Sequence, residues 1–209
     1  MNLVEILKWR YATKRMNDTK VTDQKIHNIL EAIRMAPSSF GLQPYHVFVV
    51  TDPTLKAKIK EVAWRQPQIT EASHILIFAA WSSVSIAQID KYINQVAHER
   101  KMSHDQLIGY KDKLLQFMGN FTSEQIVHWT SKQAYLGLGF GLIAAAEQQV
   151  DACPMEGFEP AKLDELLDLK SKHLKSTAIM AVGYRDITTD TYHGLAKVRR
   201  PFDDMFTFI

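Results

Sequence analysis

Basic side chains form two groups near opposite ends of this 209-residue chain. The N-terminal group consists of Lys8, Arg10, Lys14 and Arg15. In the C-terminal group, Lys197 and Arg199 stand two positions apart, so an extended backbone would point both side chains to the same face. Arginine can grip phosphate oxygens bidentately, so a phosphate is the ligand that these residue types suit. The N-terminal group alone fits a solvated charged turn, and it becomes a phosphate site only if other cations converge on it.

A second stretch with polar chemistry, residues 36–45, joins a predicted helix to a predicted strand. Pro37 ends the helix because its ring forbids helical continuation and favours extended geometry at the preceding residue. The hydroxyls of Ser38 and Ser39 and the amide of Gln43 follow on a loop between rigid supports, where binding groups often occur. An ordinary connection between a helix and a strand fits the local pattern as well.

Two other patterns lack the spacing that their chemistry needs. His98, Glu99 and His104 do not form an HExxH motif or a comparable ligand set, so no metal site is expected. Cys153 is the single cysteine, which excludes an internal disulfide. It precedes a proline and lacks a CxxC partner, so we expect a small packed side chain there and no reactive thiol.

Three glycines interrupt the most apolar helical stretch, at positions 137, 139 and 141. Each costs roughly 1 kcal/mol relative to alanine inside a helix, so their clustering suggests that something packs very close. A second helix and a partner subunit are both possible neighbours. The glycines do not form a dinucleotide fingerprint, because the spacing is GxGxG in mid-helix with no strand before it.

The composition and length of the chain predict a single domain. Hydrophobic residues make up 46% of it, enough for one substantial core or two small ones, and no linker or repeat divides it. A net charge of +2 is too mild for a nucleic-acid binder. The longest apolar run, residues 134–146, has about thirteen residues against the roughly 18 to 20 of a membrane span. Residues 1–5 lack the layout of a signal peptide, so a cytoplasmic location is expected.

Hydrophobic periodicity predicts a mixture of helices and strands. Helices are expected at residues 2–9, 23–34, 54–63, 126–149 and 160–167, with residues 86–118 mostly helical. Strands are expected at residues 46–51, 75–81 and 178–183, with a short extended piece at 150–153. Without a Rossmann or P-loop motif, this order predicts an α+β sandwich with a central sheet. The tail is apolar through Phe202, Met205, Phe206, Phe208 and Ile209, so it is expected to pack on something.

Four stretches, in order and covering nearly the whole chain, resemble the nitroreductase family of FMN-dependent NAD(P)H oxidoreductases. They are residues 7–14, residues 37–39 with 43–46, residues 154–158 and residues 197–199. The resemblance implies one domain over residues 1–209 with a mixed sheet flanked by helices. It also implies an intertwined homodimer, in which residues 185–209 form an arm that packs on the partner subunit and FMN occupies two clefts at the interface.

Family positions for the FMN phosphate match Arg10, Lys197 and Arg199. Tyr11 and Ala12 belong to the same cofactor-binding motif but depart from the family pattern. Ala12 stands where the family commonly has a serine, and Tyr11 where it often has histidine or arginine. One hydroxyl contact to the phosphate is therefore missing, which leaves the affinity for FMN open.

Two positions are expected to serve the flavin ring during catalysis. Lys14 matches the family lysine at flavin N1 and O2, where preorganised positive charge stabilises the reduced ring. Pro154, Met155, Glu156 and Gly157 resemble the loop that lies along the ring, with the backbone N–H of Glu156 meeting N5.

Further contacts are expected around these positions. Gln133 matches a family position close to the cofactor. Another ring contact corresponds to Gln68 with Arg65 beside it, and the sequence leaves open which of them faces the ring; a neutral Gln68 would lower the flavin potential. The residues that resemble contacts from the partner subunit are Pro37, Ser38 and Ser39. The candidates for the wall of a substrate pocket are Phe40, Phe117 and Phe121.

The expected function is NAD(P)H-dependent reduction of nitroaromatics, quinones or similar small acceptors. One flavin site without a separate nicotinamide fold implies ping-pong hydride transfer through N5. Two alternatives stay open. One is a flavin reductase or dehalogenase-like member that keeps the FMN but uses another acceptor, and the other is a non-catalytic flavin-binding dimer.

Overall fold

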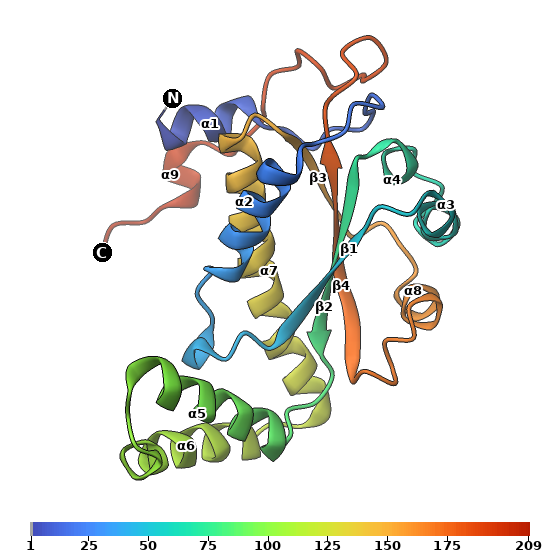
Figure 1. Cartoon of the computed structure of the whole chain (residues 1–209). Coiled ribbons are helices and arrows are strands. Elements are labelled where there is room, and N and C mark those ends of the chain that lie inside the picture. The colour runs from blue at the N-terminus through green and yellow to red at the C-terminus, as the bar shows by residue number, and fades with distance from the viewer. Residues whose placement is uncertain (1) are drawn as a thin grey trace.

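The computed structural model describes residues 2–209 as a four-stranded sheet with helices on both faces (Figure 1). The α+β class predicted from the sequence is confirmed. Met1, which the predicted domain includes, lies outside the described residues. Among residues 2–209, no helix is long and apolar enough to cross a membrane.

The strands follow the order β1-β2-β4-β3, with β1 at Tyr45–Val50, β2 at His74–Trp81, β3 at Asp151–Met155 and β4 at Leu174–Gly183. Each neighbouring pair is antiparallel. The expected mixed sheet is therefore wrong for residues 2–209, because every connection returns a strand opposite to its neighbour. Parallel pairing is confined there to one isolated bridge between Ala12 and Ala152.

β3 is longer than the extended piece predicted at residues 150–153, since Pro154 and Met155 belong to the strand and not to a loop. β3 lies at the edge of the sheet, where β4 is its one strand neighbour within the described chain and the isolated bridge to Ala12 lies on its other side. A proline lacks the N–H that a central strand needs, but an edge strand tolerates it. This edge therefore carries residues of the predicted ring loop as regular β-structure.

The sheet is buried on both faces, with neighbouring residues of β2 pointing to opposite sides. Leu76 and Phe78 pack in the core under α2 (Asp23–Arg34) and α7 (Ser123–Glu147). Ile75 and Ile77 pack in the core under three other helices. Those helices are α3 (Pro53–Val62), α4 (Gln68–Glu71) and α8 (Pro160–Leu166). β2 is therefore a continuous apolar run because both of its faces are buried under helices.

Residues 86–118 form a helical hairpin of α5 (Ile86–Arg100) and α6 (His104–Gly119). α5 ends at Arg100, and its C-cap residue Lys101 adopts a left-handed conformation with φ 53°. The capping box of Ser103 and Gln106 then starts α6. The hairpin packs near the N-terminal end of α7 (Figure 1).

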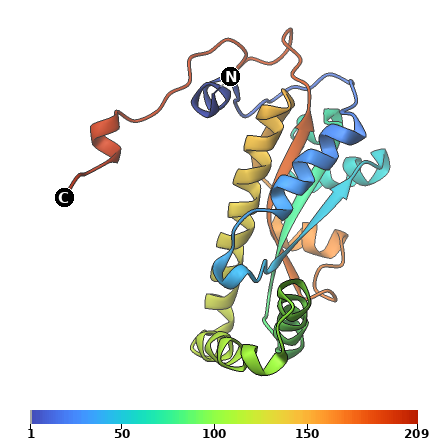
Figure 2. The ribbon, with the colours of Figure 1, turned by 60° about the vertical axis from the view of Figure 1, so that its left-hand side comes forward.

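The chain begins with α1 (Leu3–Trp9), whose capping box joins Asn2 and Glu5. It ends with an extended arm, residues 185–209, that includes the short helix α9 (Phe202–Met205). Figure 2 shows α9 and the chain end standing away from the sheet and its helices. In the single chain Val198 is 85% exposed and Phe208 86% exposed. The apolar side chains of the tail are therefore exposed in the single chain.

Two of the three glycines in α7 allow close packing by neighbouring elements of the same chain. A Cβ atom at Gly137 would lie 2.7 Å from the hydroxyl oxygen of Tyr45, and one at Gly141 would lie 3.0 Å from the side chain of Ile33. Gly139 has no such neighbour within 4 Å among the described residues. The close packing expected from the glycines thus comes from β1 and α2 at two of the positions.

Replacing Gly137 by alanine is expected to destabilise the protein. The added methyl group must displace the Tyr45 hydroxyl, which donates a hydrogen bond to the carbonyl of Ile33 at 3.2 Å. Overpacking costs about 1–3 kcal/mol and should exceed the gain of up to ~1 kcal/mol in helix propensity. Urea unfolding measures the difference. Gly109→Ala in α6 is the control, since a Cβ there meets no described atom within 4 Å and the substitution should stabilise the protein. Equal stability of the two variants would contradict this packing.

Candidate functional site

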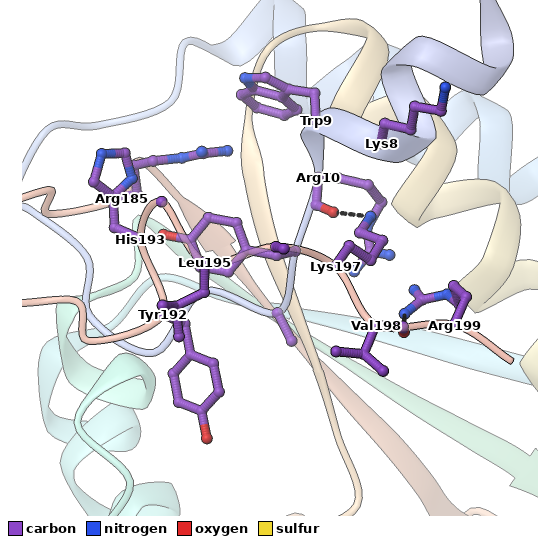
Figure 3. Close-up of a pocket in the computed structure, with 14 residues that line it drawn as sticks. Lys8, Trp9, Arg10, Arg185, Tyr192, His193, Leu195, Lys197, Val198 and Arg199 are labelled. Carbon is purple, nitrogen blue, oxygen red and sulfur yellow. Dashed lines mark hydrogen bonds between the residues drawn. The ribbon is translucent and has the colours of Figure 1, made fainter.

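The N-terminal motif (residues 7–14) and the arm line one cavity of about 640 Å³ (Figure 3). Its walls come from residues 8–12, at the end of α1, and from Arg185 with residues 192–199. The structure therefore brings Arg10 together with Lys197 and Arg199, the convergence that a phosphate site requires. These three residues are called the cation cluster below.

Lys197 fastens the arm to the end of α1. Its Nζ donates hydrogen bonds to the backbone carbonyls of Leu7 and Arg10. The carbonyl of Leu7 lies in the last turn of the helix, where carbonyls lack helical partners. Burial lowers the pKa of Lys197, and the nearby charges of Arg10 and Arg199 lower it further. The lysine is thus held in place at an electrostatic cost.

Arg10 shows what the cavity needs. Its Nε is buried and has no hydrogen-bond partner within residues 2–209. Burial lowers the pKa of Arg10, with Arg199 adding to the effect. None of the 14 described residues that line the cavity is acidic. An unpaired buried guanidinium N–H is costly, so a dianionic phosphate fits this donor set.

Two buried aspartates outside the cavity hold the N-terminal motif in place. Asp151, at the start of β3, pairs with Arg185 through its Nε at 2.8 Å and also accepts from the Thr13 hydroxyl at 3.3 Å. The Arg185 guanidinium lies 4.3 Å from the Trp9 ring and 4.7 Å from the Tyr11 ring. Arg185 is therefore stacked against the motif as well as paired with the sheet.

The second aspartate, Asp190, lies in the turn between β4 and the cavity-lining part of the arm. It accepts hydrogen bonds from the hydroxyl of Tyr11 at 3.0 Å and from the backbone N–H of Lys14 at 2.9 Å. Sequence reasoning missed both aspartates. Each is an isolated acidic residue whose partners stand far away in the chain, so no spacing marked them.

Lys14 reaches the edge of the sheet beside β3. Its Nζ lies 3.8 Å from the Sγ of Cys153, and the Nε2 of Gln68 lies 3.9 Å from the same sulfur. Gln68 is only 2% exposed. The side chain of Arg65 is 79% exposed and pairs with Glu61 at 3.1 Å. Of the two candidates for the ring contact, the structure thus turns Gln68 inward and Arg65 outward.

Cys153 is fully buried, as expected for a packed side chain. Burial raises the pKa of its thiol, whereas the nearby Lys14 and the contact with Gln68 oppose the rise. Within residues 2–209, no group of three or more His, Cys, Asp or Glu residues could hold a metal ion. The side chains that place polar atoms beside the Cys153 sulfur are those of Lys14 and Gln68.

The predicted ring loop continues from Cys153 at the sheet edge. Pro154 and Met155 complete β3, and the carboxylate of Glu156 accepts a hydrogen bond from the Tyr135 hydroxyl of α7. Burial and this hydrogen bond raise the pKa of Tyr135. A Cβ at Gly157 would lie 2.7 Å from Gln66 Nε2 and 3.0 Å from Trp64, so a larger residue there would have to displace these side chains. Sequence reasoning missed Tyr135, which supports this loop.

Other predicted site residues form a separate group near α5 and α6. The Ser39 N–H donates to the Oε1 of buried Gln133 at 2.8 Å, and the Gln43 N–H donates to the Ser38 hydroxyl at 2.8 Å. Pro37 precedes these residues at the end of α2. This loop thus rests on α7 through Gln133.

Phe40, Phe117 and Phe121 lie beside that loop as an aromatic cluster. The ring centroids of Phe40 and Phe117 are 5.1 Å apart, and those of Phe117 and Phe121 are 4.8 Å apart. Phe40 has a φ of 58°, and its carbonyl accepts hydrogen bonds from Tyr92 and Tyr110. Their role as a pocket wall stays a prediction. In Figure 1 this group lies near one end of α7, whereas α1 and the arm lie near the other end of α7.

Comparison with known proteins gives a consistent family assignment. The profile of the nitroreductase family matches residues 7–184. A Staphylococcus haemolyticus protein, provisionally named an NAD(P)H nitroreductase, is 31% identical over 99% of this chain and 97% of its own length. The oxygen-insensitive NAD(P)H nitroreductase of Salmonella typhimurium is 27% identical over 99% of both chains.

Solved structures show the same fold. A protein of Exiguobacterium sibiricum, provisionally named a nitroreductase and solved in complex with FMN, superposes with a TM-score of 0.84. It is 19% identical, with coverage of 100% of this chain and 98% of its own. From the matched profile and the relatives that span the whole chain, we conclude that this protein belongs to the nitroreductase family.

Proposed function

We propose that the chain is an NAD(P)H oxidoreductase that binds FMN at the cation cluster and reduces small acceptors such as nitroaromatics or quinones. The observation that carries this proposal is the buried Nε of Arg10, which has no hydrogen-bond partner within residues 2–209 and lies in a cavity whose described lining includes basic but no acidic residues. The Exiguobacterium relative with bound FMN and the relatives named for NAD(P)H nitroreductase activity support it. Bound FMN would supply hydride transfer from NAD(P)H to the acceptor.

The chain's own residues would divide the work. Arg10, Lys197 and Arg199 would hold the phosphate through charge-assisted hydrogen bonds. Lys14 would supply positive charge at the ring, with Gln68 as a neutral donor beside it. The backbone N–H of Glu156 would face the reacting edge, on a loop held by Gly157 and Tyr135. With one ring to share, NAD(P)H and the acceptor would bind in turn.

We further propose a homodimer in which the arm crosses to the partner. The arm exposes Val198, Phe202 and Phe208, and α7 exposes Leu136 and Phe140 in the single chain. Exposed apolar surface of this kind marks an interface. The second group of predicted site residues lies away from the cation cluster, so a partner subunit could supply it. Each site would then contain residues from both chains.

The direct test is the absorption spectrum of the purified protein before and after anaerobic NADH and NADPH. We expect a flavin spectrum that either nucleotide bleaches and that a nitroaromatic or quinone restores. A protein that binds FMN but resists bleaching by both nucleotides would be a non-catalytic flavin binder. A protein that binds no FMN at micromolar concentrations would refute the proposal.

Arg199→Ala is expected to weaken FMN binding without unfolding the protein. Loss of a charge-assisted hydrogen bond costs about 1.5–3 kcal/mol, which raises the dissociation constant roughly 10- to 150-fold. Fluorescence titration measures it. Arg34→Ala is the matched control, because Arg34 is exposed and pairs with Glu31 on α2. Equal affinity in the two variants would remove Arg199 from the phosphate site.

Lys14→Met is expected to make bound FMN harder to reduce while leaving phosphate binding largely intact. Removing positive charge near the ring favours its oxidised form. A tenfold decrease in the equilibrium constant for reduction corresponds to a midpoint potential about 30 mV more negative for a two-electron couple. A redox titration at saturating FMN reports the shift. Lys25→Met serves as control, since the Nζ of Lys25 lies 5.5 Å from the centre of the Tyr184 ring and Lys25 is not among the described residues that line the cavity. An unchanged midpoint in Lys14→Met would place Lys14 away from the ring.

Deleting residues 202–209 is expected to weaken the dimer and FMN retention together. The deletion removes exposed apolar side chains, each worth about 1.5–3 kcal/mol when fully buried, but none of the cation cluster. Light scattering and flavin content are measured on the same sample. A truncated dimer with full flavin would show that the arm does not cross.

A further inference from the structure

Asp190 occupies an unusual position for a turn residue. It is 5% exposed, although residues on both sides of its turn are exposed. Its Oδ2 accepts from the Tyr11 hydroxyl at 3.0 Å, from the Lys14 N–H at 2.9 Å and more weakly from the Arg15 N–H at 3.5 Å. Its Oδ1 accepts from the Tyr192 N–H at 2.9 Å. One carboxylate thus touches both segments that line the cavity.

Asp186, four residues earlier, shows what an ordinary turn carboxylate does. It accepts from the N–H of Thr188 at 2.9 Å and from the hydroxyls of Thr188 and Thr189 at 2.6 Å. All these contacts lie within its own turn. Those of Asp190 with Tyr11 and Lys14 span 179 and 176 residues. Asp190 therefore does more than close a turn.

The contacts of Asp190 fix the starting point of both basic groups. The hydrogen bond from the Lys14 N–H to Asp190 fixes the backbone from which the lysine side chain extends to Cys153. The hydrogen bond from the Tyr192 N–H to Asp190 fixes the start of the cavity-lining segment 192–199. Tyr192 precedes Lys197 by five residues. A shift of the carboxylate would move Lys14 and the cation cluster relative to each other.

We propose that Asp190 is a positioning residue that holds the N-terminal motif and the arm in register, so that FMN affinity and flavin potential both depend on its carboxylate. This inference rests on the proposed function. It assigns Asp190 no contact with the cofactor. The carboxylate acts through Tyr11, Lys14 and Tyr192.

The charge state of Asp190 agrees with this role. Burial raises its pKa, but the N–H groups of Tyr192 and Lys14 and the hydroxyl of Tyr11 lower it by more, so the pKa lies below its usual value. The group is therefore ionised at neutral pH. An ionised carboxylate can accept hydrogen bonds at both of its oxygens. Asp190 needs both, because one oxygen contacts Tyr192 and the other contacts Tyr11 and Lys14.

Asp190→Asn tests the proposal, because it keeps the size of the side chain and replaces one acceptor oxygen with a donor. We expect the FMN dissociation constant to rise at least tenfold and the midpoint of the saturated protein to become more negative. In the protein without FMN, amide hydrogen exchange should accelerate in residues 11–15 and 192–199. Asp186→Asn is the matched control, expected to change affinity less than about twofold.

Tyr11→Phe is the second variant, because it removes one bond to the carboxylate and keeps the ring. We expect at least threefold weaker FMN binding and a midpoint shift of the same sign, and this variant decides the matter if Asp190→Asn does not fold. Unchanged affinity, potential and exchange in Asp190→Asn would overturn the proposal. So would unchanged affinity and potential in Tyr11→Phe.

Wild-type protein and Arg199→Ala are titrated alongside to separate two failures. If wild type binds FMN and Arg199→Ala loses it while Asp190→Asn does not, the Asp190 inference alone is overturned. If wild type binds no FMN, the proposed function fails. Hydrogen exchange then decides by itself whether Asp190 couples the two segments.

Discussion

Repulsion among like charges is the constraint on which the site depends. Arg10, Lys197 and Arg199 share one cavity, and none of its described lining residues is acidic. Burial lowers the pKa values of Arg10 and Lys197, and the nearby positive charges lower them further. Left alone, these groups would separate into solvent. The fold holds Lys197 with neutral acceptors, since its Nζ donates to the carbonyls of Leu7 in α1 and of Arg10 just after it. The cluster's charge therefore stays available to a ligand.

The acidic residues that support this arrangement are kept outside the cavity. Asp151 holds Arg185 against Trp9 and Tyr11, and Asp190 holds Tyr11 and Lys14. Both carboxylates are buried and hydrogen-bonded, so each stabilises the N-terminal motif without neutralising the cation cluster. The sheet edge places Cys153 of β3 beside the Nζ of Lys14. The cavity thus keeps its basic character because Asp151 and Asp190, which position its walls, are not among its described lining residues.

Much of this could be predicted from the sequence where a repeating pattern existed. The periodicity of Ile26, Ile29 and Ile33 marks α2, and the apolar run of β2 marks a strand buried on both faces. The antiparallel pairing was not predictable in this way, because strand partners are chosen by tertiary packing. Nor was the inward turn of Gln68, which depends on the four-residue helix α4. Asp190 escaped detection because its partners lie about 180 residues away.

The phosphate role of the cation cluster is tested most directly by titrating FMN and riboflavin side by side, since the two ligands differ only in the phosphate. We predict that FMN binds at least a hundredfold more tightly at low salt, that added salt narrows the gap, and that Arg10→Met removes most of it. Riboflavin affinity should respond little to salt or to that substitution. Equal affinities for the two ligands in the wild-type protein would contradict a phosphate site at Arg10, Lys197 and Arg199.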